Sequence, residues 1–249
     1  MLPSGSTDSF GMLKGHYQAV AATNARDIEA AQALRALCFG VQGRLDADAF
    51  DQHKQHILIR DLRTGQLASC FRVEVLTGPM LKQSYAAQFY DLARLSRNNE
   101  PMMELGRFCV RPGLNDPDVV RIAWASLTQY VEAHGIKLLL GCTSFAGTDA
   151  DRYGDVFALL HDRYLGPPAW RPDVKAPEVV RFSPRDLGRS DLKLAMQALP
   201  PLLRTYLMMG GWVSDHAVVD RHLKTLHVFT GLSINAIPEA RKRLLRGLI

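Results

Sequence analysis

The residues best suited to chemistry form a short run, Glu104-Leu105-Gly106-Arg107, in a segment that is otherwise apolar. A carboxylate and a guanidinium are costly to bury unless they are paired or used for function. Positions i and i+3 of a regular strand face opposite sides, so a bulge at Gly106 would be needed to bring both charges onto one face. General base catalysis by Glu104 is one interpretation, and a structural ion pair across the sheet is the other.

A second candidate is an acidic loop that contains Asp46, Asp48 and Asp51. Its carboxylates can receive a cationic substrate, and the alternative is a solvated turn. Arg72 lies in a neighbouring apolar segment and could meet Glu104 from an adjacent strand.

The sequence lacks the motifs of several other functions, among them metal binding, covalent catalysis and nucleotide binding. His53 and His56 are three residues apart beside a strand and would diverge, so no metal site is predicted. The turn Gly141–Gly147 does not match the GxSxG nucleophile elbow, and neither a P-loop nor a GxGxxG motif occurs. The basic residues are not interleaved with aromatic ones, which argues against nucleic acid. The four cysteines form no CxxC pair and are expected to be buried thiols.

The elements that must position these residues are strands and one well-capped helix. Strands are expected at 56–61, 66–75, 103–110 and 136–141, from their apolar and β-branched content. The helix begins after Asp116 as N-cap, with Pro117 at its first position, and Gly135 closes it. Its predicted apolar stripe is Val120, Trp124, Leu127 and Val131.

This order of elements predicts an α/β (α+β) fold with a mixed central sheet flanked by helices. We expect a loose leader over residues 1–18, a core over 19–165, and a C-terminal extension over 166–249 that packs on the core. A short basic helix is expected from Pro238 to Arg246. Its leucines could pack on the core, or the helix could bind a carrier protein or a membrane.

The composition of the chain limits the classes of protein to which it can belong. The chain has 249 residues, with 47% hydrophobic residues and 22% charged ones, which excludes wholesale disorder. A formal net charge of +5 favours acidic partners without choosing among them. No stretch approaches the roughly 18 apolar residues of a membrane span, so we expect a cytoplasmic protein, or one peripheral to the inner face of the membrane.

Several segments, in this order, resemble bacterial L-ornithine Nα-acyltransferases, and the resemblance covers nearly the whole chain. The matching segments are Ala30–Arg35, Asp46–Asp51, His56, Arg72, Glu104–Val110, Gly141–Thr148 and Leu199–Arg204. The resemblance implies a GNAT-like fold, similar also to acyl-homoserine-lactone synthases. It implies transfer of a 3-hydroxyacyl group from acyl carrier protein to the α-amine of L-ornithine, by direct attack and without an acyl-enzyme.

The resemblance also suggests roles for individual residues. Glu104 and Arg107 would be catalytic, with Glu104 as the base and Arg107 orienting it or binding substrate. Backbone amides near the strand end would hold the oxyanion, and polar side chains would bind substrate. The oxyanion residues are Phe108, Cys109 and Val110, and the substrate-binding residues are Arg35, Asp48, Asp51, Arg72 and Ser144.

A missing motif fits the donor that the resemblance implies. GNAT enzymes that use acetyl-CoA carry an [RQ]-x-x-G-x-[GA] loop for pyrophosphate, but Arg111–Pro117 lacks that spacing. No bound cofactor is therefore expected. The donor would be acyl-phosphopantetheine on acyl carrier protein, whose single phosphate Arg111 and Arg121 could hold.

Two alternatives remain open. One is an acyl-homoserine-lactone synthase that uses S-adenosylmethionine. The other is a non-enzymatic protein that binds acyl carrier protein or the membrane surface. The expected partners are acyl carrier protein, L-ornithine and an anionic membrane surface.

Overall fold

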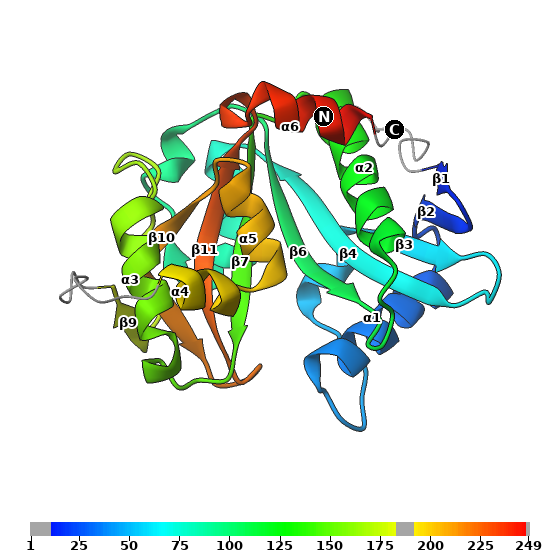
Figure 1. Cartoon of the computed structure of the whole chain (residues 1–249), viewed down its shortest axis with the longest axis horizontal. Coiled ribbons are helices and arrows are strands. Elements are labelled where there is room, and N and C mark those ends of the chain that lie inside the picture. The colour runs from blue at the N-terminus through cyan, green and yellow to red at the C-terminus, as the bar shows by residue number, and fades with distance from the viewer. Residues whose placement is uncertain (1–10, 183–191, 248–249) are drawn as a thin grey trace. The chain divides into compact units, whose positions relative to one another are not determined.

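The structure, a computed structural model, describes residues 11–182 and 192–247 (Figure 1). Over these residues the chain divides into two compact units. Each unit contains a layer of strands with helices packed against it.

The first unit contains the described residues up to Glu74, then Leu105–Ile136, and the residues from Glu239. Its strands are hydrogen-bonded in the order β1-β2-β3-β4-β6. Helix α1 packs on β3, and α2 packs on β1, β2 and β3. The elements are β1 (Met12–Lys14), β2 (Tyr17–Ala21), α1 (Ala25–Phe39), β3 (Gln55–Asp61), most of β4 (Leu67–Leu76), the second half of β6 (Met102–Val110), α2 (Pro117–Ala133) and α6 (Glu239–Arg246).

The second unit contains Val75–Glu104 and Lys137–Pro238. Its strands follow the order β6-β7-β11-β10-β9, and a separate pair joins β5 and β8. The β6–β7 pair is parallel, whereas β7–β11, β10–β11 and β9–β10 are antiparallel. The elements are β5 (Tyr90–Asp91), β7 (Leu138–Ala146), α3 (Gly154–Arg163), β8 (Asp173–Val174), β9 (Val179–Arg181), α4 (Leu192–Ala198), α5 (Pro201–Met208), β10 (Trp212–Asp220) and β11 (Thr225–Ser233).

The predicted mixed sheet with flanking helices is therefore confirmed, as are β3, β4 and β6 within a residue or two. Helix α2 begins after the predicted cap, where the Asp116 side chain accepts a hydrogen bond from the Asp118 backbone N–H. Trp124, Leu127 and Val131 are buried as expected, but Val120 is 39% exposed and Val119 is buried in its place.

Three boundaries differ from the prediction. Strand β7 spans Leu138–Ala146, so most of the segment expected to turn after residue 141 is part of the strand. The leader expected to be loose forms the β1–β2 hairpin over residues 12–21, where Tyr17 and Ala19 are buried; residues 1–10 lie outside the described chain. The C-terminal third supplies β10 and β11, which join β7 in the sheet instead of packing on it. Polar residues inside these strands, such as Ser214 and His216 at 0% exposed, interrupt the apolar pattern that would have revealed them.

The predicted backbone irregularity in β6 falls one residue later than expected. Arg107, and not Gly106, has a left-handed conformation with φ of 52°. Among the described residues, no helix is long and apolar enough to cross a membrane.

Candidate functional site

Three arginines and three aspartates of the first unit form a group that we call the arginine–aspartate cluster. They come from α1, the acidic loop, β4 and β6: Arg35, Asp46, Asp48, Asp51, Arg72 and Arg107. Three positive charges balance three negative ones. Asp46 and Asp51 are only 7% and 6% exposed, so the alternative of a solvated turn is wrong for them.

Each arginine of the cluster bridges two aspartates. Arg35 lies 2.8 Å from Asp46 (Nε to Oδ2) and 2.7 Å from Asp51 (Nη1 to Oδ1). Arg72 Nη1 lies 2.7 Å from Asp48 Oδ1 and 2.6 Å from Asp51 Oδ1. Arg107 lies 3.0 Å from Asp46 (Nε to Oδ2) and 3.2 Å from Asp48 (Nη2 to Oδ2). The sequence analysis selected these arginines but did not predict that they share the aspartates.

A short 3-10 helix, Ala49–Gln52, fixes the shape of the acidic loop. The Asp48 carboxylate accepts a hydrogen bond from the Phe50 backbone N–H at 2.9 Å. In return, Asp51 Oδ2 accepts the Asp48 backbone N–H at 3.1 Å, which completes a capping box. Hydrogen bonds within the loop therefore orient Asp51 in addition to its contacts with the arginines.

The arginines keep Asp48 and Asp51 ionised. Burial would raise the pKa of Asp48, but hydrogen bonding and charge from Arg72 lower that pKa below its usual value. Burial opposes ionisation of Asp51 too, yet its pKa is lowered, mainly by Arg35. Asp48 has the most exposed carboxylate of the cluster, with 22% of its side chain accessible, against 8% for Asp46 and 5% for Asp51. Asp48 is thus the aspartate best placed to meet a cation from solvent.

The conformation of Arg107 directs its side chain into the cluster. With φ of 52° it departs from extended geometry, in a region that non-glycine residues seldom adopt. Its guanidinium also lies 5.9 Å from the centre of the Phe39 ring, at the end of α1. Strain of this kind persists only where surrounding contacts enforce it, and it is common at functional sites.

Glu104, the expected base, has a different environment in the second unit. It is 2% exposed, and its two carboxylate oxygens accept the backbone N–H groups of Tyr85 (2.9 Å) and Ala86 (2.8 Å). These amides begin the 3-10 helix Ala86–Gln88. Hydrogen bonds from amides stabilise the charged form of a carboxylate.

The residues expected to hold the oxyanion follow Glu104 along β6. The parallel register of β6 with β7 ends at the pair Glu104–Leu140, so Phe108, Cys109 and Val110 lie beyond its last pair. Within the first unit, the Phe108 ring stacks on Phe71 at 5.5 Å, and the Ser69 hydroxyl donates to the Cys109 carbonyl at 2.6 Å. These contacts fix the strand that carries the amides.

The two expected phosphate ligands are already engaged. Arg111 Nε donates to the Leu67 carbonyl at 2.7 Å, and Arg121 pairs with Asp118 at 2.9 Å. Asp116 and Asp118 also place two carboxylates at the start of α2. A phosphate there would have to compete with Asp118 for Arg121.

Ser144, the last expected substrate-binding residue, is exposed on β7, and its Cα partner on β11 is His227. His227 is 2% exposed, and its Nδ1 lies 3.1 Å from the Tyr90 hydroxyl. Burial lowers the pKa of His227 to about 4, so its imidazole is neutral near pH 7. Tyr90 and His227 are 137 positions apart in the chain, so the sequence pattern does not indicate that they are in contact.

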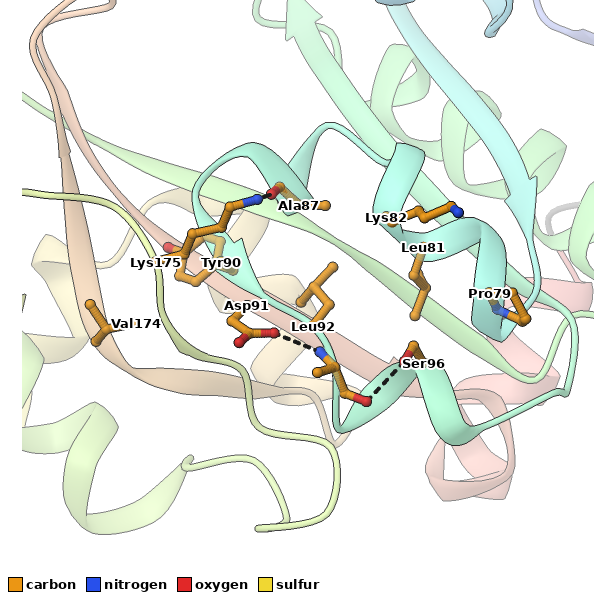
Figure 2. Close-up of a pocket in the computed structure, with 11 residues that line it drawn as sticks. Pro79, Leu81, Lys82, Ala87, Tyr90, Asp91, Leu92, Ser96, Val174 and Lys175 are labelled. Atoms are coloured by element: carbon orange, nitrogen blue, oxygen red, sulfur yellow. Dashed lines mark hydrogen bonds between the residues drawn. The ribbon is translucent and has the colours of Figure 1, made fainter.

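An open cavity of about 490 Å³ lies in the second unit (Figure 2). Leu81, Leu92 and Tyr90 give it apolar walls, while Lys175 reaches across to donate to the Ala87 carbonyl. Ala87 belongs to the 3-10 helix that Glu104 holds. None of the predicted site residues lines this cavity.

Comparisons with known proteins identify the domain type and the family. A family model described as an acetyltransferase (GNAT) domain matches residues 33–125. An N-acyl amino acid synthase from uncultured soil microbes has a similar structure, with a TM-score of 0.53 and 11% identity over 94% of this chain and 98% of that one. The L-ornithine N(alpha)-acyltransferase of Rhodobacter capsulatus is 31% identical, over 91% of this chain and 93% of the relative. The protein of the same name from Brucella abortus is 31% identical, over 77% and 71%.

The fold is of the GNAT type, as the sequence predicted, and the relatives together with the domain match define an acyltransferase. Sequence identity of 31% over nearly the full length of a relative also identifies the family within this class. The chain belongs to the L-ornithine N(alpha)-acyltransferase family and is an N-acyltransferase.

Proposed function

We propose that this enzyme transfers a 3-hydroxyacyl group from acyl carrier protein to the α-amine of L-ornithine. The observation that carries the proposal is the family membership, since the relatives at 27–31% identity are all named for ornithine. The arginine–aspartate cluster supports it, because it offers both a carboxylate for a side-chain ammonium and guanidinium groups for a carboxylate.

The reaction would be a direct attack. The α-ammonium of ornithine gives up a proton, through a water, to the Glu104 carboxylate. The free amine attacks the thioester carbonyl, and amides among Phe108, Cys109 and Val110 stabilise the resulting oxyanion. Collapse of that intermediate breaks the C–S bond and forms the amide, and the leaving thiolate takes up a proton.

Substrate orientation would fall to the cluster. Asp48 would receive the side-chain ammonium of ornithine, with Asp51 holding the loop in place. Arg72 or Arg107 would meet the carboxylate, and Arg35 would keep Asp51 ionised. Ser144 would contact substrate from β7.

The donor assignment has its own test. Arg111 would meet one phosphate together with Arg121, which would have to leave Asp118, and the two carboxylates at the start of α2 oppose the larger charge of a pyrophosphate. We therefore expect a higher kcat/KM with acyl carrier protein than with coenzyme A at matched chain length. Equal values for the two donors would overturn the carrier preference.

The reaction itself is tested by mass spectrometry of lipids from a host that expresses the chain. An N-acylated ornithine supports the proposal. A diffusible acyl lactone would instead indicate a lactone synthase. A folded protein that yields neither product would indicate a binding function.

A further inference from the structure

Helix α6 lies on the outside of the first unit, with Lys242 and Leu245 half-buried and its other residues exposed. None of its eight residues, all of which are described, is buried. It lies beside the C-terminal end of α2 (Figure 1), where Arg246 Nε pairs with Glu132 Oε1 at 2.9 Å. This contact gives the helix a defined position.

The helix is strongly cationic. Arg241, Lys242, Arg243 and Arg246 outnumber Glu239, which leaves a net charge of +3 over eight residues. The Lys242–Glu239 and Arg246–Glu132 pairs are each partly open to solvent. Exposed pairs of this kind are weak, so an anionic surface can compete for their cations.

An apolar side chain stands among these cations. Leu244 is 58% exposed, although the sequence allowed its leucines to pack on the core. A purely electrostatic partner gives no benefit to an exposed leucine. A lipid interface does, because it accepts the apolar side chain below the level of the headgroups that meet the cations.

We propose that α6 docks on an anionic lipid bilayer, lying in the plane of the interface with Leu244 inserted and Arg241 and Arg243 among the lipid phosphates. The choice of lipid over an acidic protein rests on the proposed function, whose acylated product is itself an amphiphile. Attachment by so short a helix is reversible and weakens with salt.

The test is co-sedimentation of the full chain with vesicles. Binding is expected to vesicles that contain phosphatidylglycerol and not to pure phosphatidylcholine, with loss at high salt. Arg243→Glu and Leu244→Asp should each lower the partition coefficient several-fold, on the order of tenfold for the charge reversal. Thermal melting confirms that each variant is folded.

Two matched variants serve as controls. Leu37→Asp alters a leucine of α1 that is 57% exposed, and Arg163→Glu reverses an arginine of α3 that is 53% exposed. Both should bind vesicles as the parent chain does.

Failure of vesicle binding, or binding that the α6 variants leave unchanged, overturns the inference. A rise in KM for acyl carrier protein with no change in sedimentation would assign the helix to a protein partner instead. An acyl-transfer assay with soluble substrates is read separately. Vesicle binding without ornithine acylation would overturn the proposed function alone.

Discussion

The arginine–aspartate cluster of the first unit differs from Glu104 and His227 of the second unit in how burial of the ionisable groups is compensated. In the first unit, buried charges face opposite charges from other side chains, as Arg35 does with Asp46 and Asp51. In the second, Glu104 rests on two backbone amides, and His227 is kept neutral by burial. The cluster therefore depends on every one of its side chains, whereas the second unit depends on backbone geometry and on pH.

The largest expected effect concerns Glu104. In Glu104→Gln the side-chain amide cannot accept both backbone N–H groups and cannot take up a proton. We expect kcat for ornithine acylation to fall by roughly 10²–10⁴. The free energy of unfolding should fall by about 1–3 kcal/mol.

A control separates the two effects. Glu74 is a largely buried carboxylate that lies 3.3 Å from Lys54, so Glu74→Gln should cost stability without changing kcat. A folded Glu104→Gln with a normal rate would leave Glu104 a purely structural role.

Replacing one arginine tests whether the side chains of the arginine–aspartate cluster depend on one another for stability. Arg35→Met leaves two buried carboxylates without their main partner, and we expect a loss of about 3–5 kcal/mol in the free energy of unfolding. Arg60 pairs with Asp27 in a more exposed position, so Arg60→Met should cost about 1 kcal/mol or less. Urea denaturation measures both, and equal losses would refute the idea of a mutually dependent cluster.

The second unit should respond to pH through His227. The pKa of a histidine is near 6.5 in the unfolded chain, and burial lowers that of His227 to about 4. Between these values the unfolded state binds more protons, so stability falls as the pH falls. From pH 6.5 to 5 the contribution lost is about 2 kcal/mol.

Variants isolate this contribution from that of other histidines. His227→Gln should reduce the slope of unfolding free energy against pH. His53→Gln should not, because His53 is 48% exposed. Equal slopes in the parent chain and in His227→Gln would contradict the prediction.

The smallest expected effect sharpens the role of Asp48. Asp48→Asn keeps the cap of the 3-10 helix but removes a charge, and KM for ornithine should rise about tenfold, with a smaller change in kcat. The variant should also lose discrimination between ornithine and norvaline, which lacks the side-chain ammonium. Asp46→Asn, at a more buried position, should cost stability instead. Unchanged discrimination in Asp48→Asn would exclude Asp48 as the ammonium ligand.

Much of the framework could be predicted from local signals. The N-cap and Pro117 located α2, and continuous apolar runs located β3 and β6, because these features act within a few residues of the chain. The β1–β2 hairpin could not be predicted, because its strands are short. Strands β10 and β11 could not be predicted either, because buried polar residues interrupt their apolar pattern.

For the candidate site, too, some features could be predicted from the sequence and others could not. The types and spacing of Arg72, Arg107 and the three aspartates marked them as candidates. Their pairing joins positions up to 61 residues apart, and no local pattern encodes that. Glu104 accepts hydrogen bonds from two backbone amides, which every residue except proline carries, so no choice of residue type at 85 or 86 reveals these contacts.

The division of the chain has a consequence for biosynthesis. The path passes between the two units four times, at Glu74/Val75, Glu104/Leu105, Ile136/Lys137 and Pro238/Glu239. Neither unit is one continuous stretch, so neither can be expressed alone by cutting the gene at a single point. On the ribosome, the first unit must wait for the whole of the second to be translated before α6 emerges to complete it.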